Sequence, residues 1–147
     1  WLLYVPARQS PHKATGPRID SAHRLRMLEL ATEHLPRVGI WTDELDRSDG
    51  SVPSYTIDTL RRLRHWLDAH AGEEVRLRLL LGADQARSFH TWREPHEIVR
   101  IARPLVMLRG HDADADTLVA HMAAAASWSG DELHRWRNGV VTTGLKG

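Results

Sequence analysis

Short apolar runs alternate along the chain with longer segments in which apolar residues recur every three or four positions. The short runs, typical of β-strands, occupy residues 1–5, 38–41, 75–81 and 104–108. The longer segments, 20–35 and 57–67, predict amphipathic helices that are ended by Pro36 and Gly72. Because helices separate the strands, the pattern predicts an α/β fold built on an open parallel sheet with helices on both faces.

The remaining segments carry weaker patterns and no internal repeat. They predict, in chain order, a loop at 6–17, an acidic and turn-rich stretch at 42–51, a turn at 82–84 leading into 85–91, a short helix at 95–102 and a last helix at 114–128. Residues 130–147 give no readable pattern.

Composition narrows the class of protein. With 147 residues, 41 % of them hydrophobic, the chain has the size of a single domain with its own core. The absence of cysteine excludes disulfides, thiolate catalysis and iron–sulfur clusters, and agrees with a cytoplasmic location. A formal net charge of +1 provides no general attraction to nucleic acid or anionic membranes. The longest uncharged apolar stretch, 118–128, falls well short of the ~20 residues of a membrane span, so we expect a soluble protein.

Polar side chains follow two of the predicted strands. Arg8, His12 and Lys13 come after the first strand and are donors suited to phosphate oxygens. Gly82 and Asp84 follow the third strand, where glycine allows close approach of a ligand and the carboxylate suits ribose hydroxyls or a metal-bound phosphate. Ligands of open parallel sheets bind at the carboxyl ends of the strands, so we expect both loops at that edge. Taken singly, the basic loop fits a solvated surface better than a ligand site, and the Gly-x-Asp turn fits a helix cap as well as a ligand site.

Two further features fit either a ligand site or ordinary structure. Residues 54–59, Ser-Tyr-Thr-Ile-Asp-Thr, place hydroxyls and backbone N–H groups at a helix start, which favours an anion but also describes a simple N-cap. Trp92 offers an indole face for stacking on a flat ring, or is a half-buried tryptophan. The arginines of 61–64 fit a solvated helix face better than an RNA contact, because no aromatic residues interleave with them. The spacing of His and Asp residues predicts no protein metal site.

Four sequence blocks together resemble bacterial nicotinate-nucleotide adenylyltransferases of the nucleotidyltransferase superfamily. They are V-P-A-R-Q-S-P-H-K at 5–13, H-R-L-R-M-L-E-L-A at 23–31, P-S-Y-T-I-D-T-L at 53–60, and L-G-A-D at 81–84 followed by Phe89 and Trp92. The similarity covers about residues 1–110, and the last two blocks are specific as a pair.

The resemblance implies a Rossmann-like nucleotidyltransferase fold and transfer of AMP from ATP to nicotinate mononucleotide, giving deamido-NAD and pyrophosphate, with Mg²⁺ on the phosphates and no covalent enzyme intermediate. On the charge and hydropathy given above we expect no nucleic-acid or membrane partner, and a homo-oligomer stays open. It assigns no catalytic residue. By motif, it places His12, Lys13, Gly82 and Asp84 at ATP and its phosphates, and Tyr55, Thr56, Trp92 and Arg93 at the mononucleotide.

The chain departs from the family pattern at both ends. The G-x-F-x-P-x-H-x-G-H segment, whose histidines stabilise the reacting phosphate, is absent, so we expect roughly 20 to 30 further residues upstream, enough for a strand and a helix. The S-S-T-x-x-R helix start that holds ATP has only a poor counterpart at 142–144, so 111–147 is expected to be divergent or incomplete. Three alternatives stay open: a relative that binds nucleotide without turnover, an adenylyltransferase for another phosphorylated acceptor such as a pantetheine phosphate, and an RNA-binding module.

Overall fold

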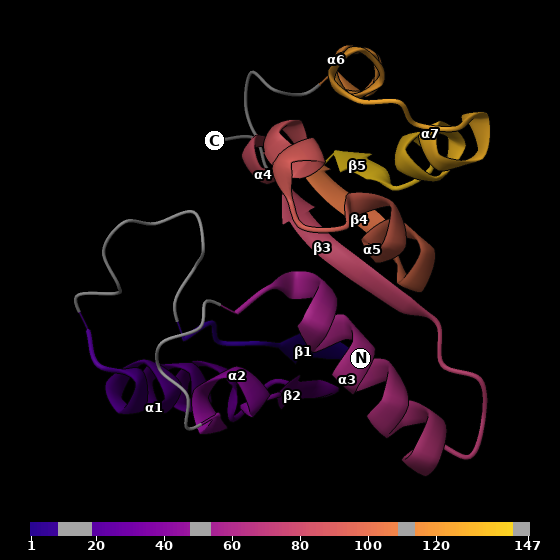
Figure 1. The fold of residues 1–147 in the computed structure, drawn as a ribbon. Coiled ribbons are helices and arrows are strands. Elements are labelled where there is room, and N and C mark those ends of the chain that lie inside the picture. Colours follow the sequence, from indigo (N-terminus) through magenta and orange to yellow (C-terminus); the bar gives the residue numbers. More distant parts are fainter. Residues whose placement is uncertain (9–18, 48–53, 109–113, 143–147) are drawn as a thin grey trace. The chain divides into compact units, whose positions relative to one another are not determined.

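The computed structural model describes residues 1–8, 19–47, 54–108 and 114–142. The chain divides into two compact units, Trp1–Thr59 and Leu60–Gly147, which we name the N-terminal unit and the C-terminal unit. Helix α3 (Thr56–His70) begins in the first and continues into the second (Figure 1).

The N-terminal unit is built on one β–α–β crossover. Strands β1 (Leu2–Tyr4) and β2 (Val38–Ile40) pair in parallel, and helix α1 (Ser21–Thr32) connects them. The helix begins where the Asp20 carboxylate accepts a hydrogen bond from the Ala22 N–H at 3.1 Å, a capping contact that satisfies one of the free donors of the first turn. A single-turn helix, α2 (Asp43–Asp46), follows β2.

The C-terminal unit contains a three-stranded parallel sheet in the order β3-β4-β5 (Figure 1). The register runs from Leu77 opposite Ala102 to Gly82 opposite Met107. Its elements after α3 are β3 (Leu77–Gly82), α4 (Ala83–Ser88), the 3₁₀ helix η1 (Phe89–Thr91), α5 (Pro95–Ile101), β4 (Ala102–Leu108), α6 (Ala115–Ala125), α7 (Gly130–Arg137) and β5 (Val140–Thr142).

One face of this sheet carries the core. Along β4 the buried residues alternate with more exposed ones, as expected of a strand covered on one face. The buried alanines of α4, Ala83 and Ala86, let that helix lie close to β3 and β4, and the buried rings of Phe89 and Trp136 contact each other. The buried apolar residues of the elements from β3 to β5 are Leu81, Ala83, Ala86, Phe89, Ile98, Val99, Ala102, Val106, Leu108, Leu118, Val119, Met122 and Trp136.

The parallel α/β class expected from the sequence is confirmed, and the predicted strand runs all contain strands. Helix α1 ends at Thr32 instead of continuing to residue 35. The acidic stretch 42–51 contains the unpredicted helix α2, and Gly82 is the last residue of a strand that runs directly into α4, with no separate turn. The unreadable segment after residue 130 contains α7 and β5.

Candidate functional site

The junction between β3 and α4 positions the first pair of predicted site residues. Gly82 ends the strand with extended backbone (φ −78°, ψ 161°), and Ala83 begins the helix at once. The junction therefore lies at the carboxyl end of β3, beside Met107 near the end of β4. This is the edge at which open parallel sheets bind their ligands.

Gly82 and Asp84 are in close contact. A Cβ built on Gly82 would lie 2.6 Å from Asp84 Oδ1, so the glycine leaves room for the carboxylate to fold over the backbone. Asp84 Oδ2 accepts a hydrogen bond from Gln85 Nε2 at 3.1 Å, while the residue as a whole stays exposed. The strand end thus presents an accessible carboxylate whose orientation depends on the missing side chain at position 82.

Trp92 lies at the margin of an aromatic cluster. Its ring is 4.9 Å from that of Phe89 at an interplanar angle of 34°, and Phe89 in turn meets Trp136 edge-on at 4.9 Å and 74°. Phe89 and Trp136 are buried, whereas Trp92 is half-buried. The indole is therefore held by the core on one side, an arrangement that pre-positions an aromatic surface at low entropic cost.

The segment after Trp92 is held by an ion pair from helix α3. Glu94 has a left-handed backbone (φ 51°, ψ 54°), a conformation that costs a non-glycine residue free energy. Both of its carboxylate oxygens accept hydrogen bonds from Arg61, at 3.1 and 2.6 Å. The hydrogen bond from Arg61 lowers the pKa of Glu94 below its ordinary value of 4.5. Arg93, which precedes this anchor, has an exposed side chain with Nε 4.0 Å from Glu94 Oε1.

Tyr55 and Thr56 lie at the start of α3, within the N-terminal unit. The Tyr55 carbonyl accepts hydrogen bonds from the N–H groups of Asp58 and Thr59, at 3.1 and 3.2 Å, which is the N-cap arrangement. Thr59 Oγ1 donates to Glu44 Oε1 at 2.6 Å, and both residues are buried. The first turn of α3 is therefore tied to α2 through a buried carboxylate.

Two predicted site residues, His12 and Lys13, lie outside the described residues, as does 143–144 of the weak ATP motif. Arg8 lies within them, and its guanidinium donates to the Arg47 carbonyl. In the described part of the chain, no group of three or more His, Asp or Glu side chains is placed to hold a metal ion. Nor is any helix there both long and apolar enough to span a bilayer.

Comparison with known proteins places these features in a family. A family model described as cytidylyltransferase-like matches residues 1–134. The chain belongs to the cytidylyltransferase-like family. The resemblance to nucleotidyltransferases and the fold that it implied are thereby confirmed.

Several relatives are named as probable nicotinate-nucleotide adenylyltransferases. The protein from Thermomicrobium roseum is 36 % identical over 125 residues, covering 84 % of this chain and 55 % of the relative. That from Rhodopirellula baltica is 36 % identical over 115 residues (78 % and 50 %), and that from Aquifex aeolicus 38 % identical over 108 residues (74 % and 59 %). The chain thus spans between half and three fifths of the length of these relatives.

Within this member of the cytidylyltransferase-like family, the C-terminal unit contains Gly82, Asp84, Trp92 and Arg93, while Tyr55 and Thr56 belong to the N-terminal unit. The sequence did not indicate two contacts that hold these segments in place, the hydrogen bond from Thr59 to Glu44 and the Arg61–Glu94 ion pair. Glu44 lies in a single turn of helix, too short to show periodicity, and residues 61 and 94 are far apart in the chain. The Glu-Pro dipeptide at 94–95 indicated only that the backbone of Glu94 is not right-handed helical, because a residue before proline is restricted away from that region.

Proposed function

We propose that this protein is part of an enzyme that transfers AMP from ATP to nicotinate mononucleotide, giving deamido-NAD and pyrophosphate. The observation that carries the proposal is the Gly82–Asp84 junction at the carboxyl end of β3, within a chain 36 % identical to a relative named for that activity. Glycine, carboxylate and half-buried Trp92 follow one another there in the order that the motif requires.

The reaction needs positioning and charge neutralisation more than covalent chemistry. A phosphate oxygen of the mononucleotide attacks the α-phosphorus of ATP, a new P–O bond forms, and the bond to the β-phosphate breaks to release pyrophosphate. Mg²⁺ bound to the ATP phosphates would supply charge neutralisation. Because Mg²⁺ keeps several waters and takes few protein ligands, the single exposed carboxylate of Asp84 is compatible with such a substrate-borne ion.

The proposed residue roles follow the chemistry of each side chain. Gly82 and Asp84 would contact the nucleotide of ATP, and His12 and Lys13 its phosphates. In a second group, Tyr55 and Thr56 would meet the nicotinate end, Trp92 would stack on the pyridine ring, and the Arg93 backbone would lie near the ring carboxylate. Half-burial of Trp92 against Phe89 supports the stacking role, because the indole is already ordered before a ligand arrives.

The first test is pyrophosphate release from ATP and Mg²⁺ with nicotinate mononucleotide, using nicotinamide mononucleotide as the control. We expect turnover with the acid form, and a marked preference for it over the amide. Saturable binding of the mononucleotide without turnover would mean that this chain carries only the substrate-recognition part of the activity. Turnover with a different phosphorylated acceptor, and none with the mononucleotide, would reassign the substrate.

Trp92→Ala tests the mononucleotide assignment against a matched control. Stacking on an aromatic side chain is worth about 1–3 kcal/mol per base, so we expect the Kd for nicotinate mononucleotide to rise about tenfold or more while that for ATP changes little. Trp66→Ala removes a more exposed indole, which stacks on His70 at 4.7 Å, and should leave both constants unchanged. An equal loss of both ligands in Trp92→Ala would assign Trp92 to the core.

Lys13→Ala and Gly82→Ala test the ATP assignment. Removing the Lys13 ammonium should weaken ATP more than the mononucleotide. Alanine at 82 meets only the flexible end of Asp84, so the fold should persist while the carboxylate moves and ATP binding falls. If neither variant changes ATP binding, neither Lys13 nor the Gly82–Asp84 junction holds ATP.

A further inference from the structure

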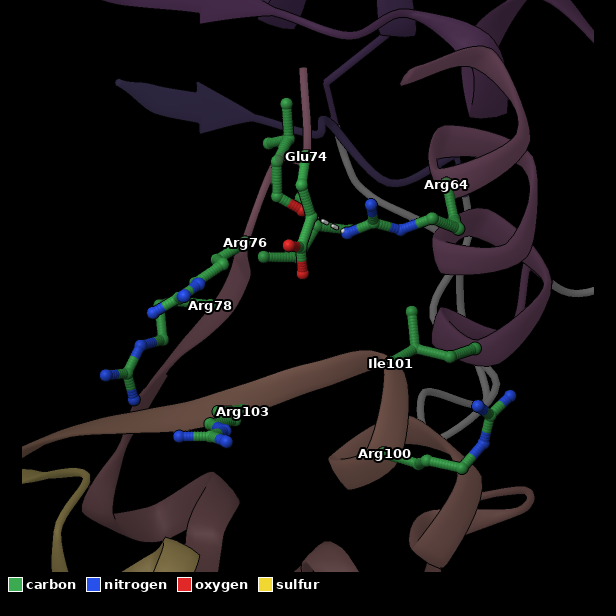
Figure 2. A pocket seen from close by; sticks show the side chains of 9 residues that line it. Arg64, Glu74, Arg76, Arg78, Arg100, Ile101 and Arg103 are labelled. Atoms are coloured by element: carbon green, nitrogen blue, oxygen red, sulfur yellow. Dashed lines mark hydrogen bonds between the residues drawn. The ribbon is translucent and has the colours of Figure 1, made fainter. Parts of the chain in front are cut away.

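Five arginines line one hollow at the amino end of the C-terminal sheet. The hollow has a volume of about 540 Å³ and is lined by Arg64 of α3, by the segment 74–78 that leads into β3, and by Arg100, Ile101 and Arg103 where α5 passes into β4. Figure 2 shows Arg76, Arg78 and Arg103 on one side of it, with Arg64 and Arg100 on the other.

Two of the five guanidinium groups are already neutralised. Arg64 donates to the Val75 carbonyl at 2.6 Å and to Asp68 at 3.3 Å. Arg100 makes two hydrogen bonds to Glu97, at 2.7 and 2.6 Å, which raise the pKa of Arg100 further above its already high ordinary value. These two arginines have the partners expected of a structural surface.

The other three, Arg76, Arg78 and Arg103, make no hydrogen bond or ion pair with any residue that the structure describes. Arg78 and Arg103 are directly opposite each other on neighbouring parallel strands, and Arg76, in the segment just before β3, lines the same hollow. All three are exposed. Like charges directly opposite each other on adjacent strands destabilise a sheet, so this group costs free energy unless an anion lies between the side chains.

We propose that Arg76, Arg78 and Arg103 form an anion site for a small ligand with two or more phosphate groups. The planar guanidinium fork matches phosphate oxygens in geometry and charge. A hollow of about 540 Å³ lies within the size range of small-molecule sites and is larger than a single phosphate requires. A second hollow of about 300 Å³ is also lined by Arg78 and Arg103 and, in addition, by Arg135 of α7. The positively charged surface therefore continues from the first hollow into the second.

The lining favours a small anion over a nucleic acid. Among the described residues that line the first hollow, none has an aromatic side chain on which a base could stack. The carboxylates of Glu74 at the first hollow and Asp131 at the second would repel a long phosphate backbone, whereas a compact ligand can avoid both.

This site is separate from the candidate active site. Arg78 lies four residues before Gly82 on the same strand, a separation of about 13 Å along β3, and toward the opposite end of the sheet. The proposal therefore does not depend on the proposed adenylyl transfer, and either can fail alone.

Titration of the whole chain with sodium tripolyphosphate at constant ionic strength tests the site by calorimetry and thermal unfolding. We expect saturable binding and a rise in Tm, since a ligand that binds the folded state stabilises it. Arg78→Gln with Arg103→Gln should weaken binding by about tenfold or more. Arg100→Gln, in the same hollow but already paired with Glu97, is the matched control and should bind as the original chain does.

Without ligand, the double variant should have an equal or higher Tm, because the repulsion is gone. An unchanged or higher Tm indicates a ligand site, whereas a lower Tm would indicate that the two arginines stabilise the fold. The proposal is overturned if the double variant binds tripolyphosphate as tightly as the original chain while Lys13→Ala abolishes binding, which would place the anion at the candidate active site. It is equally overturned if tripolyphosphate does not bind, or if only an oligonucleotide does so.

Discussion

The two units bury different kinds of residue. Among the described residues, the buried polar or charged side chains, Thr32, Glu44 and Thr59, all belong to the N-terminal unit, where Ile57 is the buried apolar residue. The other buried apolar residues belong to the C-terminal unit. Most of the exposed large apolar residues, in contrast, belong to the N-terminal unit, including Trp1 at 93 % and Met27 at 60 % exposure.

The difference shows how unevenly the chain is stabilised. Parallel strands are stable when both faces are covered, and all three residues of β1 are exposed. The C-terminal unit combines apolar burial with a ring of aromatic contacts, whereas the N-terminal unit relies on capping and on the Glu44–Thr59 hydrogen bond. We therefore expect local unfolding to begin in the N-terminal unit.

The largest expected effect comes from the aromatic core. Trp136 is 1 % exposed, and Trp136→Ala should lower the free energy of unfolding by about 3–5 kcal/mol through lost burial and a cavity. Leu3→Ala, at a residue 40 % exposed in β1, should cost less than about 1 kcal/mol. Urea denaturation followed by circular dichroism measures both. Similar losses from the two variants would contradict the uneven distribution of stability.

Gly139→Ala tests how tightly α7 and β5 are fitted against β4. A Cβ there would lie 2.2 Å from the Pro104 carbonyl oxygen, a backbone atom that cannot move aside. We expect a loss of about 1–3 kcal/mol, typical of overpacking. Gly130→Ala is the control, because nothing lies within 4 Å of its Cβ position. If Gly139→Ala unfolds at the same urea concentration as the control variant, α7 is not held by β4.

Different parts of the structure were predictable to different degrees, for physical reasons. The run 75–81 predicts β3 well, because its apolar residues first alternate with Arg76 and Arg78 and then continue without interruption to Gly82, a pattern typical of a strand. Segment 130–137 escapes prediction because it is largely polar and buries Trp136 alone, so its apolar residues are too few to show a helical period. Segment 140–142 offers only two apolar residues, Val140 and Val141, which is too few to indicate a strand. The Ser129–Glu132 capping box was nevertheless present in the sequence, as Ser-Gly-Asp-Glu, and marks the start of α7.

The candidate site divides in the same way. Local sequence predicts Gly82, Asp84 and Trp92, because their positions depend on one strand end and the helices after it. The helix start at 54–59 was also predictable from local sequence, and the Tyr55 carbonyl accepts backbone hydrogen bonds from Asp58 and Thr59 there. Glu44 and Arg61 act through partners 15 and 33 residues away in the chain, and no single-sequence pattern encodes such pairings.

Thr59→Val tests the polar core of the N-terminal unit. The change keeps the side-chain shape but removes the hydroxyl that donates to Glu44 Oε1 at 2.6 Å, so a buried carboxylate oxygen loses its donor. We expect a loss of about 1–3 kcal/mol. A double-mutant cycle with Glu44→Gln isolates the pair, and hydrogen exchange locates the loss. Additive effects of the two changes would mean that the hydrogen bond contributes nothing of its own.

The smallest expected effect concerns Arg61 and Glu94, an exposed pair that holds the segment following Trp92. Because Arg61 lowers the pKa of Glu94, the pair stabilises the folded protein above the ordinary glutamate pKa of 4.5, and this contribution disappears as the pH falls through the lowered value. The difference in Tm between the original chain and Arg61→Gln should therefore be small at pH 7 and vanish at strongly acidic pH. Arg61 also lowers the pKa of Glu97, though less than Arg100 does, so the difference in Tm reports mainly on the Arg61–Glu94 pair and to a smaller extent on Glu97. A gap that widens on acidification would show that Arg61 acts through something other than the Glu94 charge.

At neutral pH, Arg61→Gln should raise the Kd for nicotinate mononucleotide while changing Tm only slightly, because Glu94 holds its left-handed backbone only two residues after Trp92.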